Sequence, residues 1–277
     1  MLSIIGSGFV GSAVYHGFSP YFKIKIYDKF KQGYHELDET VNHSRFIFVC
    51  VPTPVTAENK QDISSLEDAI QSIVGVANER KIIVIKSTSI PGTTRMFAEK
   101  YKKHGFVFNP EFLTERNAIM DFINSYRVIL GGNENDVNDL ETIYRVRFPH
   151  ALIMKGTWEE AELIKYILNC FFATKVSIMN EVYDICQGIG IDYENIRKMF
   201  LADQRVGNSH TQVPGFDGYR GFGGKCFPKD LKSFVTFCKE KNLPCDMFAT
   251  ADLVNERVRE YKDWLEIKGA TSDNNYC

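Results

Sequence analysis

The chain has 277 residues, of which 44% are hydrophobic and 25% are charged, and its formal net charge is −2. This composition is typical of a globular protein with a sizeable core, and the length suits one large domain or two smaller ones. The near-neutral charge, without a basic block, argues against nucleic acid or an anionic membrane as the main partner, and no apolar run is long enough to span a bilayer.

The first half of the chain alternates short apolar runs with segments of helical periodicity. This alternation predicts a doubly wound α/β domain, in which a parallel sheet of the Rossmann type is covered by helices on both faces. The expected strands are residues 2–5, 23–27, 45–51, 81–85, 107–108 and 126–130. The expected helices are residues 9–18, 63–76, 92–103 and 136–146.

Near residue 155 helical segments replace the alternation. A long helix is expected from Thr157, as its N-cap, to about Cys186, because acidic residues fill its first turns and two glycines follow it. Further helices are expected at residues 192–201, 228–241 and 247–267, with a polar, glycine-rich loop at 203–225. We therefore predict an α/β domain over residues 1–155, an all-helical domain over 156–268 and a flexible tail over 269–277.

The seven cysteines and six histidines are scattered along the chain. No two cysteines have C-x-x-C spacing and no two histidines have H-x-x-x-H spacing, so neither a disulfide framework nor a metal site is predicted. Reduced thiols favour a cytoplasmic location. Because the first five residues already belong to an expected strand, we expect no signal peptide.

A glycine motif lies between the first expected strand and the first expected helix. Gly6, Gly8 and Gly11 form G-x-G-x-x-G, the dinucleotide-binding pattern, in which the glycines allow a tight turn, close approach to a pyrophosphate and helix–strand packing. Asp28 ends the second expected strand, where a carboxylate accepts hydrogen bonds from a ribose 2′-hydroxyl and repels a 2′-phosphate. The motif therefore predicts NAD, in preference to NADP, as the cofactor.

A cysteine follows a second glycine-rich segment, in the run from Gly221 to Asp230. Cys226 has Lys225 beside it and Pro228 two residues later, where proline favours the start of a helix. A neighbouring cation and a helix N-terminus both favour the thiolate, which is the nucleophilic form. The alternative is a buried structural cysteine, as most unpaired cysteines are.

Two further sets of polar residues suggest a catalytic site. Lys165 and Asn169 lie four residues apart on the long helix, hence on one face, among apolar neighbours that indicate burial. Glu111 and Glu115 follow the expected strand at 107–108, near the sheet edge where ligands bind in doubly wound folds. A solvated helix face and solvated loop acids are the alternatives.

Together these residues resemble the UDP-glucose/GDP-mannose dehydrogenase family, over residues 2 to about 257. The segment from Arg220 to Asp230 is most similar to the UDP-glucose branch of that family. The matching motifs are, in order, residues 6–11 with Asp28, 51–54, 86–94, 109–115, Lys165 with Asn169, 180–181, 203–207 and 213–230.

The resemblance implies a four-electron oxidation of a nucleotide sugar, such as UDP-glucose, from the C6 alcohol to the carboxylate by two NAD⁺. Cys226 would form a thiohemiacetal and then a thioester, while Lys165 and Asn169 stabilise oxyanions. The catalytic residues it implies are Cys226, Lys165, Asn169, Asp230, Glu115 and Thr88. The implied cofactor contacts are Gly6, Gly8, Phe9, Val10, Gly11, Asp28, Thr53, Thr88, Glu115 and Lys229. The implied substrate contacts are Glu111, Phe112, Leu113, Lys165, Asn169, Arg205, Gly215, Tyr219, Arg220 and Gly223.

The long helix predicts a homodimer, because its apolar residues spread too far round it for a one-sided surface helix. The resemblance implies that Arg205 reaches into the neighbour's site across that dimer. Three departures from the family pattern stand out: Arg116 where a glycine is usual, Lys225 before the cysteine, and no sequence for a third, UDP-binding domain. Two other functions stay open. One is a dehydrogenase of the 3-hydroxyisobutyrate type, which makes a single hydride transfer. The other is a binding module or split-enzyme component that needs a separate UDP-binding chain.

Overall fold

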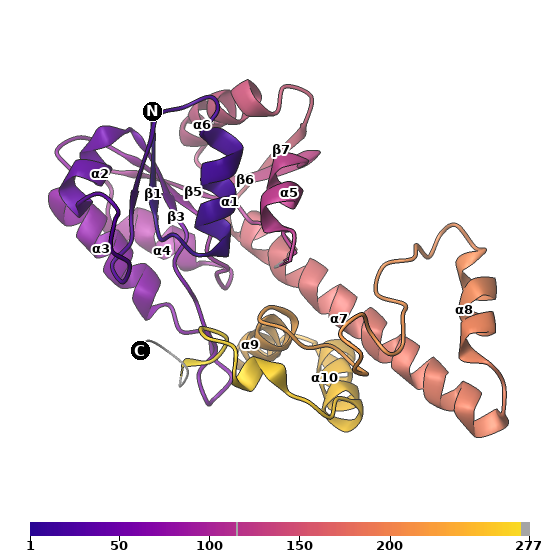
Figure 1. Ribbon diagram of the computed structural model, residues 1–277. Coiled ribbons are helices and arrows are strands. Elements are labelled where there is room, and N and C mark those ends of the chain that lie inside the picture. Colours follow the sequence, from indigo (N-terminus) through magenta and orange to yellow (C-terminus); the bar gives the residue numbers. More distant parts are fainter. Residues whose placement is uncertain (115, 273–277) are drawn as a thin grey trace. The chain divides into compact units, whose positions relative to one another are not determined.

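A computed structural model describes residues 1–114 and 116–272. The chain divides into two compact units (Figure 1). The first unit comprises Met1–Thr53 and Ile63–Lys165, and the second comprises Pro54–Asp62 and the chain from Tyr166 onward. The last boundary between the two units, between Lys165 and Tyr166, lies within one continuous helix.

The first unit is built on a seven-stranded sheet in the order β2-β1-β3-β4-β5-β6-β7. All neighbouring strands run parallel except β5 and β6, which are antiparallel. The sheet confirms the predicted doubly wound class, whereas the prediction of a purely parallel sheet was wrong at this one pair. The strands are β1 (Leu2–Ile5), β2 (Ile24–Tyr27), β3 (Phe46–Val49), β4 (Ile82–Ile85), β5 (Gly105–Phe108), β6 (Arg127–Gly132) and β7 (Leu152–Gly156).

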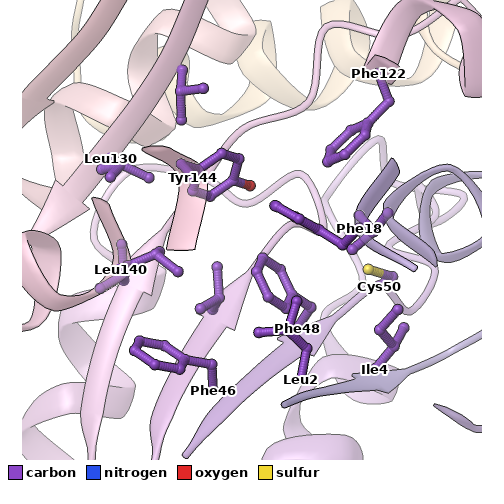
Figure 2. Packing of buried hydrophobic residues seen from close by; sticks show 14 of the residues in the cluster. Leu2, Ile4, Phe18, Phe46, Phe48, Cys50, Phe122, Leu130, Leu140 and Tyr144 are labelled. Atoms are coloured by element: carbon purple, nitrogen blue, oxygen red, sulfur yellow. The ribbon is translucent and has the colours of Figure 1, made fainter. Parts of the chain in front are cut away.

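Strand side chains alternate between two apolar layers, because successive residues of a strand point to opposite faces. Phe46 and Phe48 of β3 contribute to one layer, whereas Ile47 and Val49 contribute to the other. Figure 2 shows the first layer, where Phe18 packs against Phe48 with 5.7 Å between ring centroids. Since the central strands are buried on both faces, their sequences are almost wholly apolar.

Helices cover both faces of this sheet. Buried residues of α1 (Phe9–Phe18), α5 (Ala118–Ile123) and α6 (Glu134–Arg147) belong to the first layer. Those of α2 (Leu37–His43), α3 (Ser64–Val76) and α4 (Thr93–Lys100) belong to the second. The sequence analysis missed α2, α5 and β7, which are short and carry weak apolar periodicity, and it extended α4 to residue 103.

Helix α7 (Trp158–Ile189) is the long helix that the sequence predicts. Thr157 is its N-cap, as expected: its hydroxyl accepts from Glu160 N at 3.2 Å, and the Glu160 carboxylate accepts from Thr157 N at 2.7 Å. The helix continues through Gly188 and ends three residues beyond the expected Cys186. The chain reverses after Gly190, whose φ is +73°.

The other helices of the second unit are α8 (Tyr193–Leu201), α9 (Phe227–Glu240) and α10 (Asp246–Val258). The helix expected over 247–267 is shorter, because the backbone leaves the helical conformation at Arg259, and a 3-10 turn, Asp263–Leu265, follows. Residues 269–272 were assigned to a flexible tail. In the structure Ala270 is buried, and its carbonyl accepts from Val55 N at 3.2 Å.

Candidate active site

The glycine motif forms the turn between β1 and α1. Gly6 has φ +92°, and a Cβ there would lie 2.6 Å from the Cys50 carbonyl oxygen. A Cβ at Gly11 would lie 2.0 Å from the Gly6 carbonyl oxygen, so this glycine permits the close packing of α1 on the turn. Gly8 meets nothing within 4 Å and leaves the helix N-terminus, beginning at Phe9, open to an anion. The turn fits a dinucleotide pyrophosphate.

Asp28 lies directly after β2 and is tied to the same turn. Its Oδ2 accepts from Ser7 N and Ser7 Oγ, both at 2.7 Å, and its Oδ1 accepts from Phe30 N at 3.0 Å. Partial burial opposes ionisation, but the hydrogen bonds from Ser7 and Phe30 outweigh it and lower the pKa of Asp28. Lys31 Nζ donates to Ser7 O at 2.9 Å. A carboxylate therefore stands at the position where the pattern expects a ribose partner.

The loops after β3 and β4 are joined at the sheet edge. Thr53 Oγ1 donates to the Thr88 carbonyl at 2.9 Å, and Ser87 Oγ donates to the Val51 carbonyl at 2.7 Å. The structure thus brings together Thr53 and Thr88, two of the expected cofactor residues. They lie beyond the carboxyl ends of adjacent parallel strands, where ligands bind in this fold class.

Lys165 and Glu111 form a buried ion pair. Lys165 Nζ lies 2.7 Å from Glu111 Oε1, and the two side chains are only 4% and 5% exposed. The other carboxylate oxygen of Glu111 accepts from Leu113 N at 2.7 Å, and the Phe112 ring lies 5.8 Å from Nζ. Both residues are therefore buried rather than solvated, and the cation is held against the loop after β5.

Lys86, Asn109 and Tyr144 form a second buried polar group next to the loop after β5. The sequence did not predict it as part of the site. Lys86 Nζ donates to Asn109 Oδ1 at 2.7 Å and to its carbonyl at 3.2 Å, and the Tyr144 hydroxyl donates to the same Oδ1. Burial lowers the pKa of Lys86 to about 8 and raises that of the nearby Cys50 thiol to about 12. A lysine directly after the apolar strand β4 was the signal in the sequence that could have identified this group.

In the second unit, Cys226 is the residue that caps α9 at its N-terminus, and Pro228 occupies the first turn as predicted. The Cys226 carbonyl accepts from Asp230 N at 2.8 Å. The Asp230 side chain is buried, and its Oδ2 accepts from Asn169 Nδ2 at 2.6 Å. Two of the expected catalytic residues, Asn169 and Asp230, are thus in direct contact at the helix that follows the cysteine.

Lys229 has a partner that the sequence did not indicate. Its Nζ donates to Asp230 Oδ1, so both carboxylate oxygens of Asp230 accept hydrogen bonds. Lys229 was expected at a cofactor phosphate, and that contact stays a prediction. Asp230 thus accepts from the Lys229 ammonium and from the Asn169 amide. These two hydrogen bonds fix the orientation of both donor side chains.

The two arginines among the expected substrate contacts have different surroundings. Arg220 is half-buried and pairs with Asp184 at 2.6 Å, while its Nε donates to Asn180 Oδ1 at 3.2 Å. Arg205 pairs with Asp203, and its side chain is 88% exposed. Arg205 is therefore accessible, whereas Arg220 belongs to a partly exposed ion-pair network in which Asp184 also lies near Arg257.

The other expected substrate contacts include Gly215, Tyr219 and Gly223, which lie in the loop between α8 and α9, where Gly215 N donates to Tyr219 O at 2.8 Å. The expected Glu115 lies outside the described residues. Within the described ranges no group of three His, Cys, Asp or Glu side chains is arranged to hold a metal ion.

Comparison with known families decides the classification. The model of the NAD-binding domain of the UDP-glucose/GDP-mannose dehydrogenase family matches residues 16–147, and the model of that family's central domain matches residues 159–257. The chain belongs to the UDP-glucose/GDP-mannose dehydrogenase family. Its first unit is accordingly related to an NAD-binding domain, in agreement with the cofactor prediction.

Two relatives illustrate the match. The chain is 35% identical to UDP-glucose 6-dehydrogenase of Rickettsia bellii over 208 residues, which cover 73% of this chain and 47% of the relative. It is 31% identical to UDP-glucose 6-dehydrogenase of Bacillus subtilis over 231 residues, covering 81% of this chain and 49% of the relative. The chain therefore spans about half the length of these curated relatives.

Solved structures show the same fold. A UDP-glucose dehydrogenase from Pyrobaculum islandicum aligns with a TM-score of 0.82 at 27% identity, over 92% of this chain and 68% of that one. A 3-hydroxyisobutyrate dehydrogenase from Mycobacterium tuberculosis aligns with a TM-score of 0.74 over 92% of both chains, but at 14% identity, which shows the fold alone. Among the described residues, none of the helices is both long and apolar enough to cross a membrane.

Proposed function

We propose that this chain oxidises the C6 alcohol of UDP-glucose to the carboxylate, with NAD⁺ as the hydride acceptor and Cys226 as the nucleophile. The observation that carries the proposal is the position of Cys226 at the N-terminus of α9, one turn before an Asp230 that is bonded to Asn169. A helix N-terminus favours the thiolate over the thiol. The family's dehydrogenase relatives supply the substrate class.

The reaction balances as one alcohol, two NAD⁺ and one water giving one carboxylate, two NADH and three protons. NAD⁺ held at the glycine turn would supply the hydride acceptor for both oxidations. The first leaves an aldehyde, and the Cys226 thiolate adds to its carbonyl carbon, because an aldehyde is a poor hydride donor until a nucleophile has added. The second oxidation leaves a thioester, and water displaces the Cys226 sulfur to release the acid.

Lys165 and Asn169 supply stabilisation in this proposal. The Lys165 ammonium stabilises the alkoxide and the later oxyanions, and the Asn169 amide donates to the same oxygens. The buried Glu111 carboxylate orients Lys165 through the 2.7 Å contact. Glu115 and Thr88 are assigned to the hydrolytic water by resemblance alone. In the same proposal Gly8 and Asp28 hold the cofactor, as the turn geometry favours.

The test is the number of NADH formed per UDP-glucose, read by absorbance, with the acid measured by chromatography. Two NADH per sugar are expected. Cys226→Ser should lower acid production by at least about 100-fold, because a hydroxyl is far less nucleophilic than a thiolate. Cys245→Ser, at another half-buried cysteine of the second unit, is the matched control and should retain turnover.

Each alternative predicts another count. One NADH per sugar, or wild-type acid production by Cys226→Ser, would contradict the covalent mechanism and favour a single hydride transfer of the 3-hydroxyisobutyrate type. Binding of UDP-glucose without NADH would favour a sugar-nucleotide-binding or split-enzyme component. Addition of a separate UDP-binding chain would then be the next measurement.

We also propose a homodimer formed through α7. Phe171, Ile178 and Ile185 recur every seven residues on this helix and are 56%, 49% and 60% exposed. An exposed apolar stripe of this period is typical of a helix–helix interface. Light scattering at micromolar concentration should give a dimer, and Ile178→Glu with Ile185→Glu should give a monomer, whereas Leu253→Glu on α10 should not. A wild-type monomer would contradict the proposal.

A further inference from the structure

The backbone that leads to Cys226 is held by side chains from the end of α10. The Asn255 amide binds both main-chain groups of Phe222: Phe222 N donates to Oδ1 at 2.7 Å, and Nδ2 donates to the Phe222 carbonyl at 3.0 Å. Asn255 is 1% exposed. Gly221 leaves it room, since a Cβ there would lie 2.3 Å from Asn255 Oδ1.

Arg259, the residue that follows α10, is a buried cation beside the same loop. Its Nη1 donates to Asp217 Oδ2 at 2.7 Å and to the Arg220 carbonyl at 3.4 Å, and its Nε donates to the Tyr261 carbonyl at 2.7 Å. The guanidinium carbon lies 5.1 Å from the Tyr219 ring centroid. These bonds satisfy the buried charge, and two of them connect it to the loop, at Asp217 and Arg220.

Asp263 connects Arg259 by hydrogen bonds to Gly224, two residues before Cys226. Its Oδ1 accepts from Arg259 Nη2 at 3.1 Å, and its Oδ2 accepts from Gly224 N at 3.0 Å. Gly224 has φ +74°, so the chain makes a left-handed turn there before α9 begins. Gly223 fits tightly against the pair, because a Cβ would lie 2.2 Å from Arg259 Nη2 and 2.3 Å from Asp263 Oδ1.

We propose that the Arg259–Asp263 pair is a positioning element for Cys226. By binding Gly224 N, Asp263 fixes the left-handed turn, and the turn sets where the cysteine stands relative to the first N–H groups of α9. Arg259 orients the Asp263 carboxylate by donating to its other oxygen, Oδ1. The pair touches neither cofactor nor substrate in this proposal, which rests on the proposed role of Cys226 as the nucleophile.

The test is the pH profile of Cys226 alkylation by iodoacetamide, followed at the Cys226 peptide by mass spectrometry. Asp263→Ala removes the acceptor for Gly224 N, whereas Arg259 keeps Asp217 as a partner, so the variant should fold. Loosening the turn moves the thiol from the helix N-terminus. The rate at pH 7 should therefore fall about three- to tenfold and the profile midpoint should move to higher pH, which is the size of a helix-terminus effect.

Two further variants make the result specific. Asp263→Asn keeps an oxygen acceptor for Gly224 N and should restore part of the wild-type profile. Glu266→Ala removes a carboxylate of the same segment that binds the Tyr261 hydroxyl instead, and should leave the profile unchanged. With UDP-glucose and NAD⁺, Asp263→Ala should lower kcat more than it raises KM.

An Asp263→Ala profile that coincides with the wild-type profile, or an equal shift in Glu266→Ala, would overturn the positioning role. Alkylation does not depend on turnover. A chain that oxidises no UDP-glucose but shows the Asp263→Ala shift would therefore contradict the proposed function and leave the positioning intact. Turnover with an unshifted profile would contradict the positioning alone.

Discussion

Helix α7 carries two polar assemblies one helical turn apart, and they are built differently. At Lys165 the helix presents a cation to the carboxylate of Glu111, which lies 54 positions away in the sequence. At Asn169 it presents a neutral amide to Asp230, a carboxylate that also accepts from Lys229. The buried Lys165 depends on the Glu111 carboxylate to neutralise its charge. Asp230, in contrast, keeps Lys229 as a cationic partner even when Asn169 is removed. The two should therefore respond differently to substitution.

The largest effect should follow removal of the carboxylate at the first assembly. Glu111→Gln leaves the buried Lys165 opposite a neutral amide and should lower the free energy of unfolding by about 3–5 kcal/mol, with loss of turnover. Urea titration measures the free energy of unfolding, and NADH formation measures turnover. Glu141→Gln, at a partly exposed carboxylate that pairs with Lys155 and Arg145, is the control and should cost about 1 kcal/mol. Equal costs for the two variants would show that burial adds nothing to the pair.

A third buried carboxylate, that of Glu162 on α7 itself, sharpens the comparison, because its donors are neutral. Glu162 accepts from Gly92 N at 2.7 Å, Thr94 N at 2.8 Å and Thr94 Oγ1 at 2.6 Å. Burial raises the pKa of Glu162 to about 7, although these bonds favour the carboxylate. Because the pKa is higher in the folded state, the protonated Glu162 side chain stabilises the fold. This contribution to the free energy of unfolding is complete below pH 4.5 and is lost as the pH rises through 7.

The measurement is the free energy of unfolding of wild type and Glu162→Gln between pH 4 and 8. The wild type should lose about 3 kcal/mol relative to the variant over that range. Glu99→Gln, at an exposed position of α4, should follow the wild type. A constant difference between wild type and Glu162→Gln would show that this carboxylate does not titrate in the range.

The next effect concerns Asp28, whose carboxylate binds neutral donors at the glycine turn. Asp28→Ala should weaken NAD⁺ binding about tenfold, or about 1.4 kcal/mol, because the ribose hydroxyls lose an acceptor. NADP⁺ binding should be kept or improved, since Lys31 remains near the turn and the repelling charge is gone. Calorimetry with both cofactors measures this. Stronger binding of NADP⁺ than of NAD⁺ by the wild type would refute the preference.

The smallest loss of stability should come from the second assembly. Asn169→Ala removes one hydrogen bond from Asp230, which keeps Lys229, and should cost about 1 kcal/mol. Turnover should nevertheless fall, because the proposed mechanism uses the amide. A cost in urea titration as large as that of Glu111→Gln would break the distinction between the two assemblies.

The sequence predicted those elements whose ends are marked by residue chemistry. Helix α1 begins at the glycine motif and α7 at the Thr157 capping box, and both starts were predicted correctly. Strand direction is not marked in this way, because an apolar run reads alike in either direction. The antiparallel pairing of β5 and β6 was therefore missed, as was the edge strand β7, which is largely exposed and lacks alternation.

Residue types were likewise easier to predict than partners. The apolar neighbours of Lys165 indicated its burial, and the cysteine segment indicated a helix start. No local pattern could pair Lys165 with Glu111 or Asp263 with Gly224, since these contacts depend on tertiary packing across 54 and 39 positions. The buried Lys86 could be located after its strand, but its acceptor Asn109, 23 positions away, could not be predicted.

Residues 54–62 belong to the second unit, although residues on both sides of them belong to the first. During synthesis this segment leaves the ribosome long before Ala270, whose carbonyl it binds. At about 5–20 residues per second, the delay is roughly ten to forty seconds. The sheet of the first unit can form within that time, so the segment must emerge from a folding domain and stay soluble without its partners. Its polar residues Glu58, Asn59 and Lys60 favour solubility during that interval. The order of translation thus favours a polar sequence in this loop.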